Sequence, residues 1–124
     1  MNTHLNTEQS IYIQIAIKIE DDILRDILAE GEAIPSTNQL AALYQINPAT
    51  AAKGVNILVD EGILFKKRGI GMFVTEGGKR QIIIKRKEGF YEKYVVSLVR
   101  ESKQLNIDAE ELVEMIKRAQ HSGN

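Results

Sequence analysis

Isoleucine spacing defines the first element of the chain. Isoleucine occupies every fourth position from Ile11 to Ile27, and this period lays one apolar stripe along a helix that we expect over residues 11–30. Ser10 stands at the expected N-cap of this helix, and Gly31 follows as a stop signal. The pattern therefore predicts a long amphipathic helix at the start of the fold.

A capping box marks the start of a second helix. Ser36 and Gln39 have the spacing at which each side chain bonds the backbone N–H of the other, which predicts a helix that runs to about Tyr44. The preceding Pro35 biases Ile34 away from helical geometry. We expect the inward-facing residues of this helix to be Leu40, Ala41 and Leu43.

A third helix should follow after a very short connection at residues 45–46. Asn47 is a favoured N-cap residue, and Pro48 suits the first helical position. We expect the helix to reach Asp60, with Gly62 ending it. Its apolar face comprises Ala51, Val55, Leu58 and Val59. Two helices joined so closely predict a helix-turn-helix.

The next segment has the pattern of a β-hairpin. Two strand-like runs, residues 63–67 and 72–75, flank a turn at residues 68–71 that is rich in glycine and basic residues. Gly77 and Gly78 then mark a boundary. The order of three helices and a hairpin predicts a winged helix-turn-helix domain over residues 1–76.

The remaining residues, 77–124, predict a helical tail. Residues 79–103 have the spacing of a long helix, although the β-branched residues 82–84 leave a strand open as an alternative start. Asp108 and Glu111 form a capping box for a last helix. The expected fold class is therefore mainly α with a small β-hairpin, a winged helix-turn-helix followed by a two-helix C-terminal tail.

Composition removes most catalytic chemistry. The chain has no cysteine, and its two histidines, His4 and His121, both lie near the termini. No nucleophile stands beside a base in the body of the chain, and no metal-ligand cluster is visible, so we expect neither an enzyme nor a metal site. No targeting or membrane-spanning segment is visible either, which makes the cytoplasm the default location.

Two regions have the chemistry of a nucleic-acid interface. A helix that enters the major groove needs small or polar residues at its N-terminal end, and the third helix offers such residues with a lysine one turn on. The turn of the hairpin carries cations beside a glycine, which suits a phosphate backbone or a minor groove. The candidate DNA contacts in these regions are Asn47, Ala49, Thr50, Lys53, Lys66, Lys67, Arg68 and Gly69.

Several motifs carry a family resemblance. Tyr12-x-Gln14, Pro35-Ser36 and the run Arg-Gly-x-Gly-x-Phe-Val over residues 68–74 occur in order. With these motifs, residues 11–75 resemble the winged helix-turn-helix of the GntR family of bacterial transcription regulators. The short remainder resembles the YtrA-type subgroup, which carries a two-helix dimerisation tail in place of a large effector domain.

The resemblance implies a role for each matching position. The residues that would contact DNA at the start of the second helix are Ser36, Thr37 and Asn38. Those at the recognition helix would be Asn47, Ala49, Thr50 and Lys53, and those at the wing Arg68 and Gly69. The family usually has arginine at Asn38, alanine at Gly54 and an aromatic residue at Val55, so the operator sequence stays open.

The resemblance implies a sequence-specific DNA-binding regulator, a repressor that binds a palindromic operator as a homodimer. An alternative is a winged-helix module that binds protein without reading DNA sequence. The tail carries an apolar stripe that either packs on the winged domain or pairs with a second subunit, and we favour the second subunit. The expected dimerisation residues are Tyr91, Tyr94, Val95, Leu98, Leu112, Met115 and Ile116. No cofactor is expected, and a small-molecule effector of unknown identity is left open.

Charge is distributed unevenly along the chain. The net charge is −1, but residues 1–76 hold 6 basic and 10 acidic residues, whereas residues 77–124 hold 10 and 7. Basic residues concentrate between Lys66 and Lys87, and acidic residues on the first helix and its exit. The distribution predicts a basic band that meets DNA, opposite an acidic face that repels it.

Overall fold

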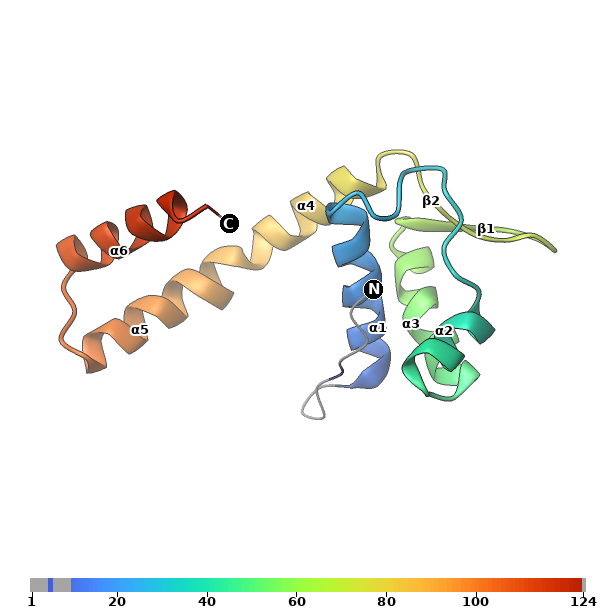
Figure 1. Cartoon of the computed structure of the whole chain (residues 1–124), viewed down its shortest axis with the longest axis horizontal. Coiled ribbons are helices and arrows are strands. Elements are labelled where there is room, and N and C mark those ends of the chain that lie inside the picture. Colours follow the sequence, from blue (N-terminus) through green and yellow to red (C-terminus); the bar gives the residue numbers. More distant parts are fainter. Residues whose placement is uncertain (1–4, 6–9, 124) are drawn as a thin grey trace. The chain divides into compact units, whose positions relative to one another are not determined.

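A computed structural model describes residue 5 and residues 10–123 of the chain (Figure 1). The chain forms two compact units, one that ends at Lys85 and one that begins at Arg86. His4 lies outside the described residues. Within the described part of the chain, no helix is both long and apolar enough to cross a membrane.

Three helices form the core of the first unit: α1 (Ile11–Leu24), α2 (Thr37–Tyr44) and α3 (Pro48–Asp60). Their inward faces meet in one apolar cluster with residues of the hairpin and of the following helix. Its fully buried large side chains are Ile15, Ile19, Ile23, Leu40, Val55, Leu58, Ile63, Leu64, Val74 and Ile82. Burial of each such side chain contributes about 1.5–3 kcal/mol, so this cluster is the main source of stability.

Helix α1 is shorter than predicted. It ends at Leu24, and Gly31 is not its stop signal. Asp26 adopts a left-handed φ of 60°, and the N–H groups of Ile27 and Leu28 turn back to the carbonyl of Asp22. Ser10 stands at the N-cap position without a side-chain capping bond. The four-residue spacing of isoleucines thus extends beyond the end of the helix. Its last member, Ile27, lies in the turn and is 53% exposed.

Helices α2 and α3 begin where the sequence predicts. The Ser36–Gln39 capping box is present, and Asn47 caps α3. The inward face of α2 differs, because Leu43 is exposed and Tyr44 is buried in its place. Burial, and secondarily the charge of Asp22, raises the pKa of Tyr44 to about 12.

Helices α1 and α3 cross at unusually short range at Gly54. A Cβ atom at this position would lie 2.6 Å from the backbone oxygen of Tyr12 and 3.0 Å from Cβ of Ile15. Glycine costs helix propensity relative to alanine. Here its missing side chain is what allows the two helices to approach.

The hairpin consists of β1 (Leu64–Lys67) and β2 (Gly71–Val74), paired antiparallel from Leu64 opposite Val74 to Lys67 opposite Gly71. The segment after α1 joins this small sheet: Ala33 forms a bridge to Phe73. This additional pairing ties the exit of α1 to the base of the hairpin, which explains why the chain leaves helical geometry well before Gly31.

The chain after the hairpin is helical. Helix α4 (Gly78–Phe90) continues through a π-helical turn, η1 (Tyr91–Val96), into α5 (Ser97–Gln104). The strand alternative for residues 82–84 is wrong, since they lie inside α4. The carboxylate of Glu30 accepts hydrogen bonds from the backbone N–H groups of Gly77 and Lys79 at the start of α4. An anion is favoured at that helix end.

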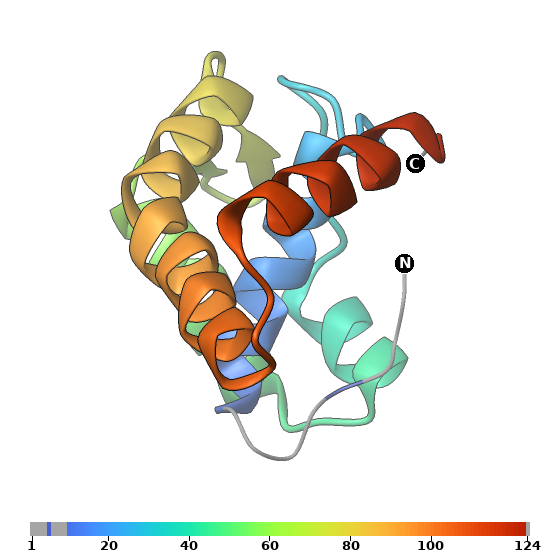
Figure 2. The same ribbon diagram turned by 90° about the vertical axis from the view of Figure 1, so that its left-hand side faces the viewer.

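The last helix, α6 (Ala109–His121), follows α5 after a turn and runs back at an angle to it (Figures 1 and 2). The side chain of Asp108 accepts a hydrogen bond from the Glu111 N–H at 2.9 Å, so the predicted start of this helix is confirmed. Together, the described residues are mainly helical with one two-stranded antiparallel hairpin, as predicted.

Candidate nucleic-acid interface

The N-terminal end of α3 presents small and polar groups to solvent. Asn47 and Ala49 are exposed, and Thr50 is half-buried. The Asn47 side-chain oxygen accepts a hydrogen bond from the Ala49 N–H at 2.8 Å, which fixes the side chain against the helix end. Its amide N–H groups remain as donors. This end of α3 therefore has the groups that base edges and phosphates bind.

Lys53 lies one turn further along α3, on the exposed surface. Its Nζ lies 4.0 Å from the centroid of the Tyr12 ring in α1, a cation–π contact. Tyr12 thus supports a predicted DNA contact from a different helix. The sequence displays Tyr12 in the Tyr-x-Gln motif, but a contact across 41 positions has no local spacing that would indicate it.

The start of α2 is a second set of polar groups. Ser36 Oγ accepts from the Gln39 N–H at 3.1 Å, and Gln39 Oε1 accepts from the Ser36 N–H at 2.8 Å. Asn38 is exposed and Thr37 is half-buried. Helix N-termini favour phosphate groups, although Asn38 adds no positive charge here.

The wing is a braced, cationic projection. Lys66, Lys67 and Arg68 are all exposed. Near the base of the hairpin, the Phe65 and Phe73 rings stack with centroids 5.7 Å apart, and Lys67 Nζ lies 4.6 Å from the Phe73 centroid. Gly69 has a φ of 78°, which a side chain would strain. The aromatic pair stiffens the hairpin and holds one cation close to its tip.

The predicted basic band is interrupted by ion pairs. Lys79 binds Asp26 at 2.9 Å, and Lys85 lies between Glu20 and Glu61, 2.9 Å from the latter. Burial alone would lower the pKa of Lys85, but hydrogen bonds to both carboxylates hold it above its usual value. Two of the cations therefore neutralise acids within α1 or just after α1 and α3 rather than face away from them.

The three cations of the wing lie outside these ion pairs. Within the part of the chain that the structure describes, no salt bridge involves Lys66, Lys67 or Arg68. The idea of a basic face opposite an acidic helix is thus wrong at Lys79 and Lys85. Sequence counting could not show this, because it does not record which charges neutralise each other.

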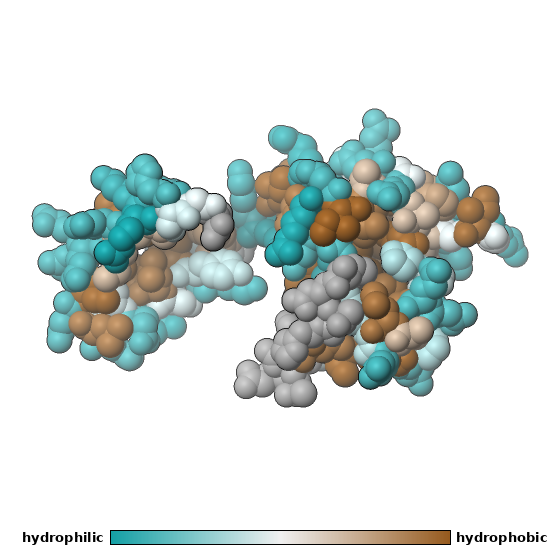
Figure 3. Space-filling model, in the orientation of Figure 1, coloured by the Kyte–Doolittle hydropathy of each residue, from teal (hydrophilic) through white to brown (hydrophobic). Residues whose placement is uncertain are grey.

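The second unit presents apolar side chains instead of burying them. Among residues 86–123, Ser102 alone is buried. Of the predicted dimerisation residues, Tyr91, Tyr94, Leu98 and Ile116 are exposed, and Val95, Leu112 and Met115 are half-buried. On the face drawn in Figure 3, apolar patches of this unit show between hydrophilic groups.

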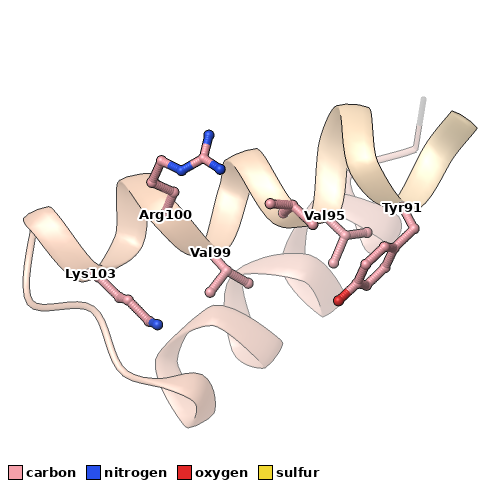
Figure 4. A pocket seen from close by; sticks show the side chains of 6 residues that line it. Tyr91, Val95, Val99, Arg100 and Lys103 are labelled. Carbon is pink, nitrogen blue, oxygen red and sulfur yellow. The ribbon is translucent and has the colours of Figure 1, made fainter.

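A cavity of about 330 Å³ opens on the second unit. It is lined by Tyr91, Val95, Val96, Val99, Arg100 and Lys103. Figure 4 shows Tyr91, Val95 and Val99 directed toward the neighbouring helix, whereas Arg100 points away from it. Its volume is at the low end for ligand sites. Tyr91 contributes to the wall and Tyr94 does not.

Comparison with known proteins decides the family. The model of bacterial regulatory proteins of the gntR family matches residues 11–74, which is about half of the chain. The chain belongs to the GntR family. The matched segment runs from the start of α1 to the end of β2, so it covers the winged domain and both candidate DNA-contacting regions.

Similar proteins extend the match into the tail. The HTH-type transcriptional regulator YhcF of Bacillus subtilis is 28% identical over 123 residues, which cover 99% of this chain and 100% of YhcF. The HTH-type transcriptional repressor YtrA of the same organism is 29% identical over 107 residues, 86% of this chain and 82% of YtrA.

A crystal structure of a GntR-family transcriptional regulator from Bacteroides thetaiotaomicron is also similar. It is 35% identical with a TM-score of 0.73, and the match covers 92% of this chain and 99% of that chain. The protein is thus a GntR-family transcriptional regulator with a DNA-binding winged helix-turn-helix, not an enzyme. The role of each individual contact residue stays a prediction.

Proposed function

We propose that this GntR regulator binds an inverted-repeat operator as a homodimer and represses transcription. The observation that carries the proposal is the pairing, in one winged domain, of a polar α3 N-terminus with a wing whose three cations form no salt bridge among the described residues. Helix α3 would read base edges in the major groove, and the wing would bind the adjacent backbone or minor groove.

The tail supports the homodimer. In the second unit, every apolar side chain among the described residues 86–123 is exposed or half-buried. Two short helices gain little stability without further burial, and an identical surface on a second copy is always available. A two-fold dimer would present two recognition helices to half-sites about 34–36 Å apart, or a multiple of that spacing.

Repression is supported by the similarity to YtrA, which is a transcriptional repressor. A dimer that occupies a promoter blocks polymerase without needing an activating contact, so the small tail is sufficient. Binding to chromosomal DNA also implies action in the cytoplasm. The cavity of the tail is where we propose that an effector, if the protein responds to one, would bind.

Binding-site selection on random duplex DNA tests the proposal. We expect an enriched inverted repeat and, at micromolar concentration, a dimer by analytical ultracentrifugation. The rival function, a winged module that binds protein only, predicts no enriched sequence. A single enriched half-site bound by a monomer would refute the dimer but keep the DNA-binding function.

Charge-matched double variants test the wing. Replacing Lys67 and Arg68 with alanine should weaken operator binding about 10- to 100-fold at 0.1 M salt and reduce the slope of log K against log salt by about 2. Replacing Lys117 and Arg118 of α6 removes the same charge from the tail and should change neither quantity by more than about twofold. Equal effects of the two pairs would refute the wing assignment.

A further inference from the structure

The tip of the wing carries an apolar side chain that phosphate binding does not require. Ile70 is 74% exposed, more than any other large hydrophobic residue that the structure describes. Its neighbours in sequence are the cations and glycines of the turn. Burial of this apolar surface in a complex would be favourable, whereas its exposure to water does not stabilise the free protein.

A tight turn with Arg68 and Gly69 at its centre fixes the backbone of Ile70, which is the last residue of that turn. Its N–H donates to the carbonyl of Lys67 at 3.0 Å, and the flanking Gly69 and Gly71 have φ values of 78° and 151°. A Cβ atom at either glycine would find no described atom within 4 Å. Bare backbone therefore surrounds one branched side chain, which leaves room for a close approach by a partner.

The base of the wing is stiff enough to present this side chain. Phe65 and Phe73 are directly paired in the hairpin and stacked, with Lys67 over the Phe73 ring. A β-branched side chain such as that of Ile70 has few rotamers to lose on binding. In Figure 3 the hairpin carries apolar groups among hydrophilic ones.

We infer that Ile70 enters the minor groove next to each half-site and selects A·T over G·C pairs there. This inference rests on the proposed DNA-binding function. The floor of the minor groove carries only acceptors at A·T pairs, whereas guanine adds its N2 amino group. An isoleucine over that amino group displaces its water and offers no acceptor in return, which disfavours G·C.

The cations beside Ile70 favour the minor groove over the major groove. Narrow minor grooves at A·T-rich sequence have enhanced negative potential, which attracts Lys67 and Arg68 to the site where Ile70 fits. Apolar wedges flanked by basic residues are a recurrent means of minor-groove binding. Ile70 would thus determine specificity at positions that α3 does not reach.

Inosine substitution tests the inference directly. An I·C pair resembles A·T in the minor groove, because it lacks the N2 amino group, but resembles G·C in the major groove. With the selected half-sites held constant, we expect flanking A·T and I·C pairs to bind equally. Flanking G·C pairs should bind about fivefold or more weakly, which is the low end of the cost of one wrong base pair.

Variants of Ile70 assign the effect to this side chain. Ile70→Ser should lose the discrimination against G·C flanks with an unchanged salt slope, because no phosphate contact is removed. Ile70→Val should retain it. Circular dichroism should show both variants folded, since the site is exposed.

Three outcomes would overturn the inference. They are I·C flanks that bind as weakly as G·C flanks, a wild-type protein indifferent to its flanks, and discrimination that persists in Ile70→Ser. The first two leave half-site binding intact, so the proposed function would survive them. A protein that selects no half-site at all would refute the proposed function itself.

Discussion

The winged unit and the tail are built from similar helices but bury very different surfaces. Among its described residues, the first unit encloses a cluster of fifteen buried hydrophobic residues drawn from its helices, its hairpin, the connecting segments and α4. The second unit, within its described residues, buries Ser102 and no apolar residue. Helical spacing in the sequence is equally clear in both units, so spacing alone does not show whether an apolar face has a partner.

Because the two units bury such different amounts of apolar surface, we expect their stability to come from different sources. A winged domain with its own core can fold from local and long-range contacts within one chain. The 13-residue helix α6 is marginal in water by itself, and α5, the end of the continuous helix that begins with α4, likewise leaves its apolar face unburied. The proposed second copy would supply that burial, so the tail should depend on protein concentration and the winged unit should not.

Truncation of a leucine side chain to alanine should give the largest difference in effect between the two units. Leu58 is fully buried in the winged unit, whereas Leu98 is 42% exposed on the tail. We expect Leu58→Ala to lower the free energy of unfolding by about 2–5 kcal/mol at any protein concentration. Leu98→Ala should have a small effect on the winged unit and raise the dimer dissociation constant. Urea unfolding and sedimentation equilibrium measure the two quantities.

The expected difference between the two units would be wrong if both leucine variants lowered the free energy of unfolding by the same amount. Equal losses at low protein concentration would show that Leu98 belongs to a core within one chain, as the alternative of a tail packed on the winged domain requires. An unchanged dissociation constant in Leu98→Ala would instead remove this residue from the proposed interface.

Replacing a glycine with alanine should change the free energy of unfolding in opposite directions in the two units. At Gly54 the new Cβ would meet backbone at 2.6 Å, so we expect a loss of about 1–3 kcal/mol despite better helix propensity. At Gly89 of α4 nothing lies within 4 Å, and alanine should stabilise by about 0.5–1 kcal/mol. Thermal unfolding of both variants checks this. Stabilisation by Gly54→Ala would show that the helices can separate at no cost.

Local capping made the helix starts predictable. Ser36, Asn47 and Asp108 each cap through groups two or three residues away, and the sequence displays those groups directly. The end of α1 was not predictable, because the bridge between Ala33 and Phe73 forms across 40 positions. Residues near in sequence determine the first kind of feature, and tertiary pairing determines the second.

The candidate site divides in the same way. The polar starts of α2 and α3 and the cationic turn of the hairpin could be located from residue types alone. The contact between Lys53 and Tyr12 and the ion pairs of Lys85 could not, because they join elements distant in sequence. Net charge counted by segment therefore overstated the amount of positive charge that is not neutralised by ion pairs. It also could not indicate which residues, such as Tyr12, contact the cations.

The ion pairs of Lys85 should make a smaller, pH-dependent contribution to the winged unit. Glu20 is buried and Lys85 is 42% exposed, so solvent screens the pair and we expect Lys85→Ala to cost about 1–2 kcal/mol. The folded pKa of Lys85 lies above its unfolded value of 10.5. The contribution is therefore complete below pH 10.5 and lost as pH rises through the folded pKa.

Urea unfolding of wild type and Lys85→Ala between pH 7 and pH 11 checks that contribution. The difference between the two proteins should shrink at the alkaline end. Lys87→Ala is the matched control, because Lys87 is exposed on the same helix and forms no salt bridge among the described residues. A difference that stays constant with pH would assign the effect of Lys85 to packing of its aliphatic stem.

The ionisation of individual tyrosines should show the smallest and most local difference between the winged unit and the tail. Burial first, and the charge of Asp22 second, raises the pKa of Tyr44 to about 12. We expect one of the four tyrosines to ionise near pH 12 by ultraviolet absorbance, with Tyr44→Phe removing that step and Tyr94→Phe leaving it. Asp22→Asn should move the step to lower pH. Because the folded pKa exceeds the unfolded value of 10.0, stability from the neutral phenol is lost between pH 10 and pH 12. A step that survives in Tyr44→Phe would place the buried phenol elsewhere.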